Sequence, residues 1–236
     1  DKKHNKKKEE QDKKQEDTGA KEEVTSKEKK EEVIEEKKQE EVVKKSKKDI
    51  SIILDDNDIP KTIREFVEYI KRYDGDLYED LEGLSYKDAY LVIRNIAKLY
   101  DEKHGKKVRK IGLIANHDKI YELNFLAVMY AGYIVCPIEN EIVKEKYKID
   151  VIVNKEEQEA FYNKAITEDE VEYSFRRVYE KDACVMFTTS GTTMQNKGIE
   201  LTYKNIFSNM YYSSKILNLN ENDVVGSVLP EYHVLR

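Results

Sequence analysis

The stretch ACVMFTTSGTTMQNKGIELT, residues 183–202, decides the fold, because an apolar strand runs directly into a loop rich in hydroxyls and glycine. Residues 183–187 form a short apolar run with strand-forming side chains, which is typical of a strand buried in a parallel sheet. Residues 199–202 then resume a strand-like pattern. We therefore predict a strand, a polar loop and a second strand over this stretch.

The loop has the composition of a phosphate-binding site. Hydroxyls and backbone amides can donate hydrogen bonds to an anion, glycine lets the backbone curl toward it, and lysine supplies positive charge. The residues that we predict to bind phosphate are Thr189, Ser190, Gly191, Thr192, Thr193 and Lys197. Their order is not that of a Walker A loop, in which the lysine follows a glycine. A simple polar turn is the alternative, but the strands on both sides favour a binding loop.

Helical and strand-like patterns alternate along the chain from residue 49 onward. The predicted helices lie at 63–70, 85–100 and 116–131, and the predicted strands at 110–115, 133–137, 149–153 and 183–187. The helix that begins at Ser85 carries a capping signal, with Asp88 three residues further on. Alternation with short links indicates an α/β domain with a parallel sheet and crossover helices.

Residues 111–138, IGLIANHDKIYELNFLAVMYAGYIVCPI, resemble a region of acyl-CoA synthetases in which a strand leads through asparagine into a buried helix, then Ala-Gly, then a strand ending at proline. Here the landmarks are Asn116, Ala131-Gly132 and Pro137. From the residues themselves we expect these positions to build the fold, with Gly132 supplying a left-handed residue at the end of the helix.

Two later segments complete an ordered series. Residues 182–206 resemble the phosphate loop of the adenylate-forming superfamily, which includes acyl-CoA synthetases, firefly luciferase and peptide-synthetase adenylation domains. The resemblance lies in the order Asp182-Ala183, the apolar strand, the hydroxyl-rich loop, Lys-Gly and Leu-Thr-Tyr-Lys-Asn-Ile (201–206). Residues 224–234 resemble the segment after that loop, where Leu-Pro and two further residues precede a histidine, here His233. The resemblance implies that His233 lines the acyl or carboxylate pocket.

The resemblance implies a partial N-terminal domain of an adenylate-forming enzyme at residues 49–236. It also implies attack of a carboxylate on ATP with Mg²⁺ present, giving an acyl-adenylate and pyrophosphate, followed by transfer to coenzyme A or a carrier thiol. The loop residues would hold the β- and γ-phosphates and Lys197 would act beside the pyrophosphate. A fatty acid is the favoured substrate, because the sequence around Asn205 and Leu229-Pro230 resembles that of bacterial fatty acid ligases.

Four departures from the family pattern keep an alternative open. Met194 and Asn196 replace a small residue and a proline in the loop, Tyr203 replaces a common histidine, and Glu231 adds a charge to the expected pocket lip. The chain also stops before the family's later acidic residues and catalytic lysine, so we expect a fragment of a longer protein and assign no catalytic residue within it. The alternatives are a catalytically reduced nucleotide-binding module, or an adenylation domain that serves a carrier protein.

Charge is distributed unevenly along the 236 residues. Residues 1–48 hold 17 lysines against 15 acidic residues, and the remaining chain holds 25 basic and 33 acidic residues. The first segment has too few apolar side chains to repay the entropy of ordering, so we predict a disordered Lys/Glu-rich tail. The acidic remainder argues against nucleic acid as a partner, and small molecules are the expected ligands.

Cysteine, histidine and hydropathy patterns complete the expectations. Cys136 and Cys184 lie in apolar runs, where reduced thiols act as small hydrophobes, and this favours a cytoplasmic protein. No histidine has partners at metal-ligand spacing, so we predict no metal site made of protein ligands. The longest apolar run, residues 125–138, has the length of a buried core segment and not of a membrane span.

Overall fold

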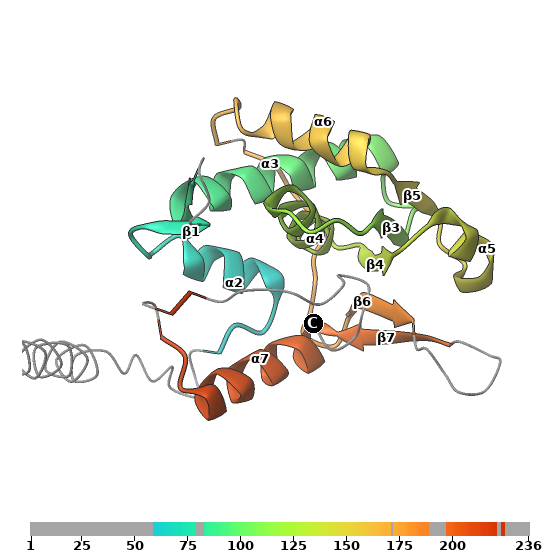
Figure 1. Cartoon of the computed structure of the whole chain (residues 1–236). Helices are drawn as coiled ribbons and strands as arrows, with labels where there is room; N and C mark the ends of the chain where they lie inside the picture. Colours follow the sequence, from blue (N-terminus) through green and yellow to red (C-terminus); the bar gives the residue numbers. More distant parts are fainter. Residues whose placement is uncertain (1–58, 79–82, 171, 189–196, 221–222, 225–236) are drawn as a thin grey trace, which may run out of the picture. The chain divides into compact units, whose positions relative to one another are not determined.

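The computed structural model describes residues 59–78, 83–170, 172–188, 197–220 and 223–224. In that part of the chain helices and strands alternate, so the predicted α/β class with a mainly parallel sheet is confirmed (Figure 1). The predicted tail, residues 1–48, lies outside the described residues. Its disorder, and the boundary that separates it from residues 49–236, therefore stay predictions.

The elements follow one another with short links. The helices are α2 (Ile63–Ile70), α3 (Tyr86–His104), α4 (Lys119–Ala131), η1 (Glu141–Val143), α5 (Lys144–Tyr147), α6 (Lys155–Ala165) and α7 (Tyr203–Leu217). The strands are β1 (Asp76–Tyr78), β2 (Leu84–Ser85), β3 (Lys110–Ile114), β4 (Ile134–Ile138), β5 (Val151–Val153), β6 (Ala183–Thr188) and β7 (Gly198–Thr202). All predicted strands and helices are therefore present, with ends that differ by a few residues.

The main sheet has the strand order β5-β3-β4-β6-β7. β5, β3, β4 and β6 run parallel, and β7 returns antiparallel to β6 as the second arm of a hairpin. The parallel strands are joined by α4 and by longer connections, as crossover topology requires. β1 and β2 form a separate antiparallel pair near the start of α3.

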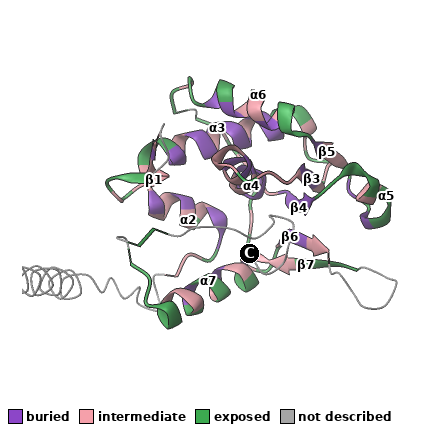
Figure 2. Ribbon diagram, viewed as in Figure 1, coloured by how far each residue is buried: buried purple, intermediate pink, exposed green. Residues whose placement is uncertain are grey.

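The two faces of the main sheet are covered differently. Ile111, Leu113, Val135 and Val185 belong to the large core, which also contains the buried sides of α2, α3, α4, α6 and α7 (Figure 2). The opposite face carries a smaller cluster made by Ile134, Cys136, Ile138, Tyr147, Ile149 and Met186. Alternation of side chains along each strand sends neighbouring residues into these two clusters.

Side-chain caps set where the longer helices begin. Ser85 Oγ accepts a hydrogen bond from the Asp88 amide at 3.0 Å, which confirms the predicted cap of α3. Asp118 Oδ1 accepts from the Tyr121 amide at 2.8 Å, so α4 begins at Lys119 and not at Asn116 as predicted. The sequence estimate was three residues early because Asp118 itself is the capping residue, and a capping residue has extended backbone angles.

The end of α4 is fixed by glycine, as predicted. Gly132 has φ +91° and ψ +24°, in the left-handed region, and its amide donates to the Met129 carbonyl. A Cβ at this position would lie 2.7 Å from Cγ of Arg176. Both the backbone conformation and the close side chain therefore require glycine.

Within the described residues, no helix combines the length and the apolar composition needed to cross a membrane.

Candidate functional site

Most residues of the predicted phosphate loop lie outside the described part of the chain. These are Thr189, Ser190, Gly191, Thr192 and Thr193, and the same holds for Met194, Asn196 and the predicted pocket residue His233. Lys197 is described and its side chain is exposed. The structure therefore describes the two strands that bound the loop, and the binding roles of the loop residues remain predictions.

The hairpin of β6 and β7 brings the two ends of the loop together. Thr188, the last residue of β6, is the register partner of Gly198, the first residue of β7. β6 runs parallel to β4, so the loop leaves the sheet at the carboxyl end of the parallel strands. In open α/β sheets ligands bind at this end, which is the placement that a nucleotide-binding loop requires.

Polar residues also follow β3, β4 and β5 at that end of the sheet, and they cap the next helices. Asn116 donates to the carboxylate of Asp118, the cap of α4, while Asn140 and Asn154 accept hydrogen bonds from the amides of Ile142 and Glu157. Asn116 therefore supports a helix start, in agreement with the structural role that we expected for it.

Gly198 lies where β7 passes close to the small core cluster. A Cβ at this position would lie 2.9 Å from Sδ of Met186 and 3.3 Å from Cδ1 of Tyr147. A side chain would displace at least one of these neighbours. Packing beneath the strand therefore favours glycine after Lys197, whatever role that glycine has in the loop.

Tyr203, at the position of a common family histidine, has a structural role here. Its ring is buried, and its hydroxyl donates to the Met129 carbonyl at 2.7 Å, which ties the start of α7 to the end of α4. Burial raises the pKa of Tyr203 well above its usual range, so the hydroxyl stays protonated. The substitution therefore leaves a neutral hydrogen-bond donor inside the core.

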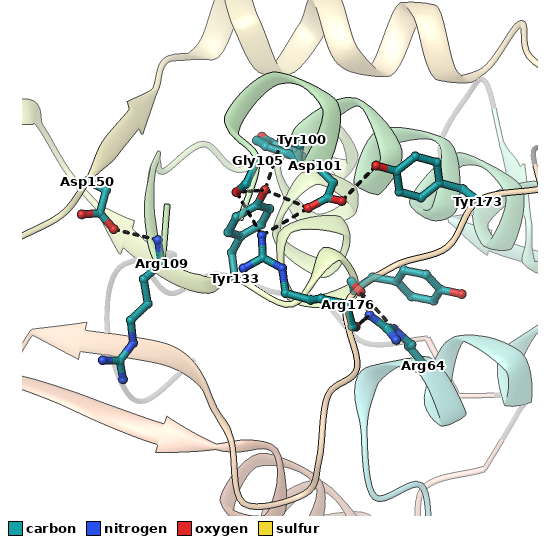
Figure 3. A network of polar contacts seen from close by, with 10 residues as sticks. Arg64, Tyr100, Asp101, Gly105, Arg109, Tyr133, Asp150, Tyr173 and Arg176 are labelled. Carbon is teal, nitrogen blue, oxygen red and sulfur yellow. Dashed lines mark hydrogen bonds and ion pairs between the residues drawn. The ribbon is translucent and has the colours of Figure 1, made fainter. Parts of the chain in front are cut away.

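The chain enters β6 from a connector, residues 172–178, that a buried polar network holds against α3 (Figure 3). Asp101, with 8% of its side chain exposed, accepts hydrogen bonds from Tyr133, Tyr173 and Arg176 at 2.9 to 3.2 Å. Arg176 also donates to the Gly105 carbonyl, and its guanidinium lies 4.2 Å from the centre of the Tyr133 ring. No family landmark predicted this network.

Arg64 on α2 extends the same network to a second helix. Its guanidinium donates to the Tyr130 carbonyl at 3.1 Å and also to the carbonyl of Arg176. Burial lowers the pKa of Arg64 from its usual value, with opposing contributions from the phenol oxygens of Tyr130 and Tyr203. The connector is therefore held through both a side chain and a main-chain carbonyl.

Neither cysteine has the environment of a reactive thiol. Cys136 and Cys184 are free and buried, and burial is the main cause that raises the pKa of each to about 12. A thiol with such a pKa is protonated at neutral pH and a poor nucleophile. They pack as small hydrophobes, as their sequence context predicts.

The described residues contain no group of three or more His, Cys, Asp or Glu side chains arranged to hold a metal ion. They do form a cavity of about 490 Å³, lined by the β1–β2 pair, α3 and the end of α6, with Asp76, Asp88 and Glu168 among its walls. Among the described residues, none of β6 or β7 lines this cavity.

Comparison with known proteins identifies relatives of this arrangement. Residues 140–236 match the family model described as AMP-binding enzyme, and this range contains the predicted loop. The predicted recognition of the adenylate-forming superfamily is thereby confirmed.

Two curated relatives and one solved structure illustrate the range of similar proteins. Gramicidin S synthase 2 of Brevibacillus brevis is 26% identical over 185 residues, covering 72% of this chain and 4% of that protein. A Mycobacterium tuberculosis protein named as a fatty-acid–CoA ligase, fadD11, is 35% identical over 63 residues, covering 27% of this chain and 11% of that one. The crystal structure of a long-chain-fatty-acid-CoA ligase from Archaeoglobus fulgidus superimposes with a TM-score of 0.61 at 16% identity, covering 74% of this chain and 44% of the other.

The chain spans less than half the length of each of these three proteins. At this identity the structural likeness shows the fold, which is that of part of the N-terminal domain of adenylate-forming enzymes.

Proposed function

We propose that the complete protein activates a carboxylic acid with ATP, on the basis of the match of residues 140–236 to the AMP-binding enzyme family. In this reaction a carboxylate oxygen attacks the α-phosphorus of ATP, the bond to the β-phosphate oxygen breaks, and an acyl-adenylate and pyrophosphate form. The observation that carries the proposal is the hydroxyl-rich segment held between β6 and β7 at the carboxyl end of a parallel strand.

The proposed work of this part of the chain is to bind and orient the nucleotide. Hydroxyls of Thr189, Ser190, Thr192 and Thr193, with the backbone at Gly191, would donate to the β- and γ-phosphates, and Lys197 would supply positive charge at the end of the loop. Donors placed in advance stabilise the charge that moves onto the leaving pyrophosphate.

We propose that a magnesium ion accompanies the nucleotide. Mg²⁺ is commonly held by substrate phosphates and only one or two carboxylates. When bound, the ion would offset negative charge on the phosphates.

We favour a fatty acid as substrate and coenzyme A as acceptor of the acyl group, with His233 lining the acyl pocket. The similarity to proteins named as fatty-acid–CoA ligases supports this choice. We place such an enzyme in the cytoplasm, where both substrates are available.

The match to gramicidin S synthase 2 favours a second candidate, because it extends over 185 residues of this chain. In that case the protein would be an adenylation domain that passes its acyl group to a carrier protein. A third candidate, a catalytically reduced nucleotide-binding module, would bind ATP without forming an adenylate.

ATP–pyrophosphate exchange by the complete protein, measured with panels of fatty acids and amino acids, tests these candidates. We expect exchange with fatty acids and thioester formation with coenzyme A. Exchange with amino acids and transfer only to a carrier protein would support the second candidate, and ATP binding without exchange would support the third.

The variant with Thr192→Ala and Thr193→Ala tests the loop itself. We expect exchange to fall by about 100-fold or more, because loss of one donor to developing charge costs about that much in other enzymes. Thr167→Ala, at an exposed threonine that donates to the Lys164 carbonyl, is the matched control and should leave exchange unchanged. Unchanged exchange in the loop variant would contradict the assignment.

A further inference from the structure

β7 is the strand onto which the predicted loop returns, and side chains from distant parts of the chain hold it. Glu200, in the middle of β7, forms an ion pair with Lys110 at 2.8 Å between Oε1 and Nζ. Lys110 is the first residue of β3, and in the order β5-β3-β4-β6-β7 two strands separate β3 from β7. The pair therefore reaches across the face of the sheet and is not a contact between neighbouring strands.

The environment of this pair sets it apart from surface ion pairs. The side chain of Lys110 is 17% exposed and that of Glu200 is 33% exposed, whereas Lys87 and Asp74, paired at 2.9 Å, are 66% and 92% exposed. Burial is the main cause that raises the pKa of the Cys136 thiol on β4, but charges on both Lys110 and Glu200 also act on it. β4 is one of the two strands that separate β3 from β7.

Lys110 is itself held from several directions. Its amide donates to Oδ2 of Asp150 at 2.8 Å, and its carbonyl accepts from the Asp150 amide at 3.1 Å. The neighbouring Arg109 amide donates to the same carboxylate oxygen at 2.8 Å (Figure 3). Its Nζ also lies 3.5 Å from the Tyr147 carbonyl. Lys110 consequently has little freedom to follow Glu200 if β7 shifts.

Tyr147 provides a second support under the same strand. Its buried ring lies against Gly198. In the sequence, Gly198 directly follows Lys197 and comes two residues before Glu200. Lys110 therefore holds Glu200 and Tyr147 holds Gly198, and these two residues lie on the same face of β7. A strand with both positions fixed cannot shift its register without breaking a partly buried ion pair and opening a packed contact.

We propose that Lys110 and Glu200 are positioning residues for nucleotide binding, because their ion pair fixes β7 and so the place from which Lys197 projects. The inference rests on the proposed function. Under this proposal β3 and β7 affect the affinity for ATP through the ion pair, without a contact between the pair and the nucleotide.

Lys110→Met and Glu200→Gln in the complete protein test the proposal, with Lys87→Met as the matched control. Each single change removes one charge with little change in volume. We expect the KM for ATP to rise between about 10-fold and 100-fold, since a misplacement of about 1 Å has effects of that size. The KM for the carboxylic acid should stay unchanged, and Lys87→Met should behave as the unaltered protein.

The double variant Lys110→Met/Glu200→Gln shows whether the two residues act together, through their ion pair, or affect nucleotide binding independently of each other. Glu200 also pairs with the Arg109 guanidinium at 3.3 Å, so Glu200→Gln removes both cationic partners and should be the worse single variant. Because Lys110 acts on β7 through Glu200, we expect the KM for ATP of the double variant to equal that of Glu200→Gln. Amide hydrogen exchange at residues 199–201 should be faster in Glu200→Gln than in Lys87→Met. An unchanged KM for ATP in both single variants would overturn the proposal, and so would a double variant whose rise is the product of the two.

Failure of the proposed function has a different signature from failure of this inference. An unaltered protein that neither binds ATP nor exchanges pyrophosphate would overturn the proposed function. If the unaltered protein exchanges pyrophosphate and the Lys110→Met and Glu200→Gln variants do so equally well, only the positioning role is overturned.

Discussion

Single residues in this domain are selected by close approaches that a sequence only partly reveals. The pair Ala131-Gly132 predicts the end of a helix, and the left-handed backbone of Gly132 agrees with that prediction. The sequence gives no sign that Arg176 passes within 2.7 Å of the place where a Cβ would lie, because that neighbour is far away along the chain. Conformation was thus predictable at this residue and packing was not.

Gly132→Ala should therefore cost more than its backbone conformation alone. A left-handed alanine costs about 1–2 kcal/mol, and displacement of the Arg176 side chain adds a packing cost of similar size. Gly75→Ala is the matched control, because Gly75 has φ +105° and nothing lies within 4 Å of its added Cβ. Chemical unfolding of both variants measures the difference, and equal losses of unfolding free energy would refute the packing argument.

Among the elements, those with strong apolar or capping patterns were the most predictable. β6 shows its burial through an uninterrupted apolar run, and α3 shows its start through Ser85 and Asp88. α6 was not predicted, since its sequence KEEQEAFYNKA is mostly polar. Its buried Gln158 donates to the carbonyls of Ile114 and Val153, so a polar side chain occupies a core position. Asn154 as a capping residue, with Glu156 and Glu157 in the first turn, was the signal that could have located it.

The junction of β7 and α7 depends on a reciprocal cap. Thr202 Oγ1 accepts from the Asn205 amide at 3.2 Å, and the Thr202 amide donates to Oδ1 of Asn205 at 3.0 Å. Thr202→Ala should lower the unfolding free energy by about 1 kcal/mol, whereas Thr202→Ser keeps the oxygen and should cost less. Equal stability of the two variants in urea unfolding would show that the side-chain oxygen does not stabilise the junction.

At the scale of the whole molecule, the Asp101 network joins segments that lie far apart in the sequence. Asp101 belongs to α3, Tyr133 precedes β4, and Tyr173 and Arg176 belong to the connector that leads to β6. Such a network was not predictable from local patterns, because the pattern of each segment does not show which distant segment it contacts. The family resemblance predicted the order of the elements and the position of the loop between β6 and β7 but not the contacts that hold them.

Asp101→Asn should destabilise the whole domain strongly. It leaves the Arg176 guanidinium, with 21% of its side chain exposed, without its carboxylate, and loss of one partner of a buried ion pair costs about 3 kcal/mol. Tyr173→Phe removes one hydrogen bond to the same carboxylate and should cost about 1 kcal/mol. Unfolding curves that rank the two variants in the opposite order would contradict this account of the network.

The strand order also has a kinetic consequence. Val135 of β4 pairs with Val185 of β6, and this is the most distant pairing in sequence within the described sheet, because β5 is made in between and joins the far side of β3. During synthesis β3, β4 and β5 leave the ribosome before β6 does. Closing the longest loop is entropically the most costly step, so the β6–β7 hairpin is the part of the sheet that joins last. The segment that bears the predicted binding loop is thus also the one whose arrival completes the described sheet.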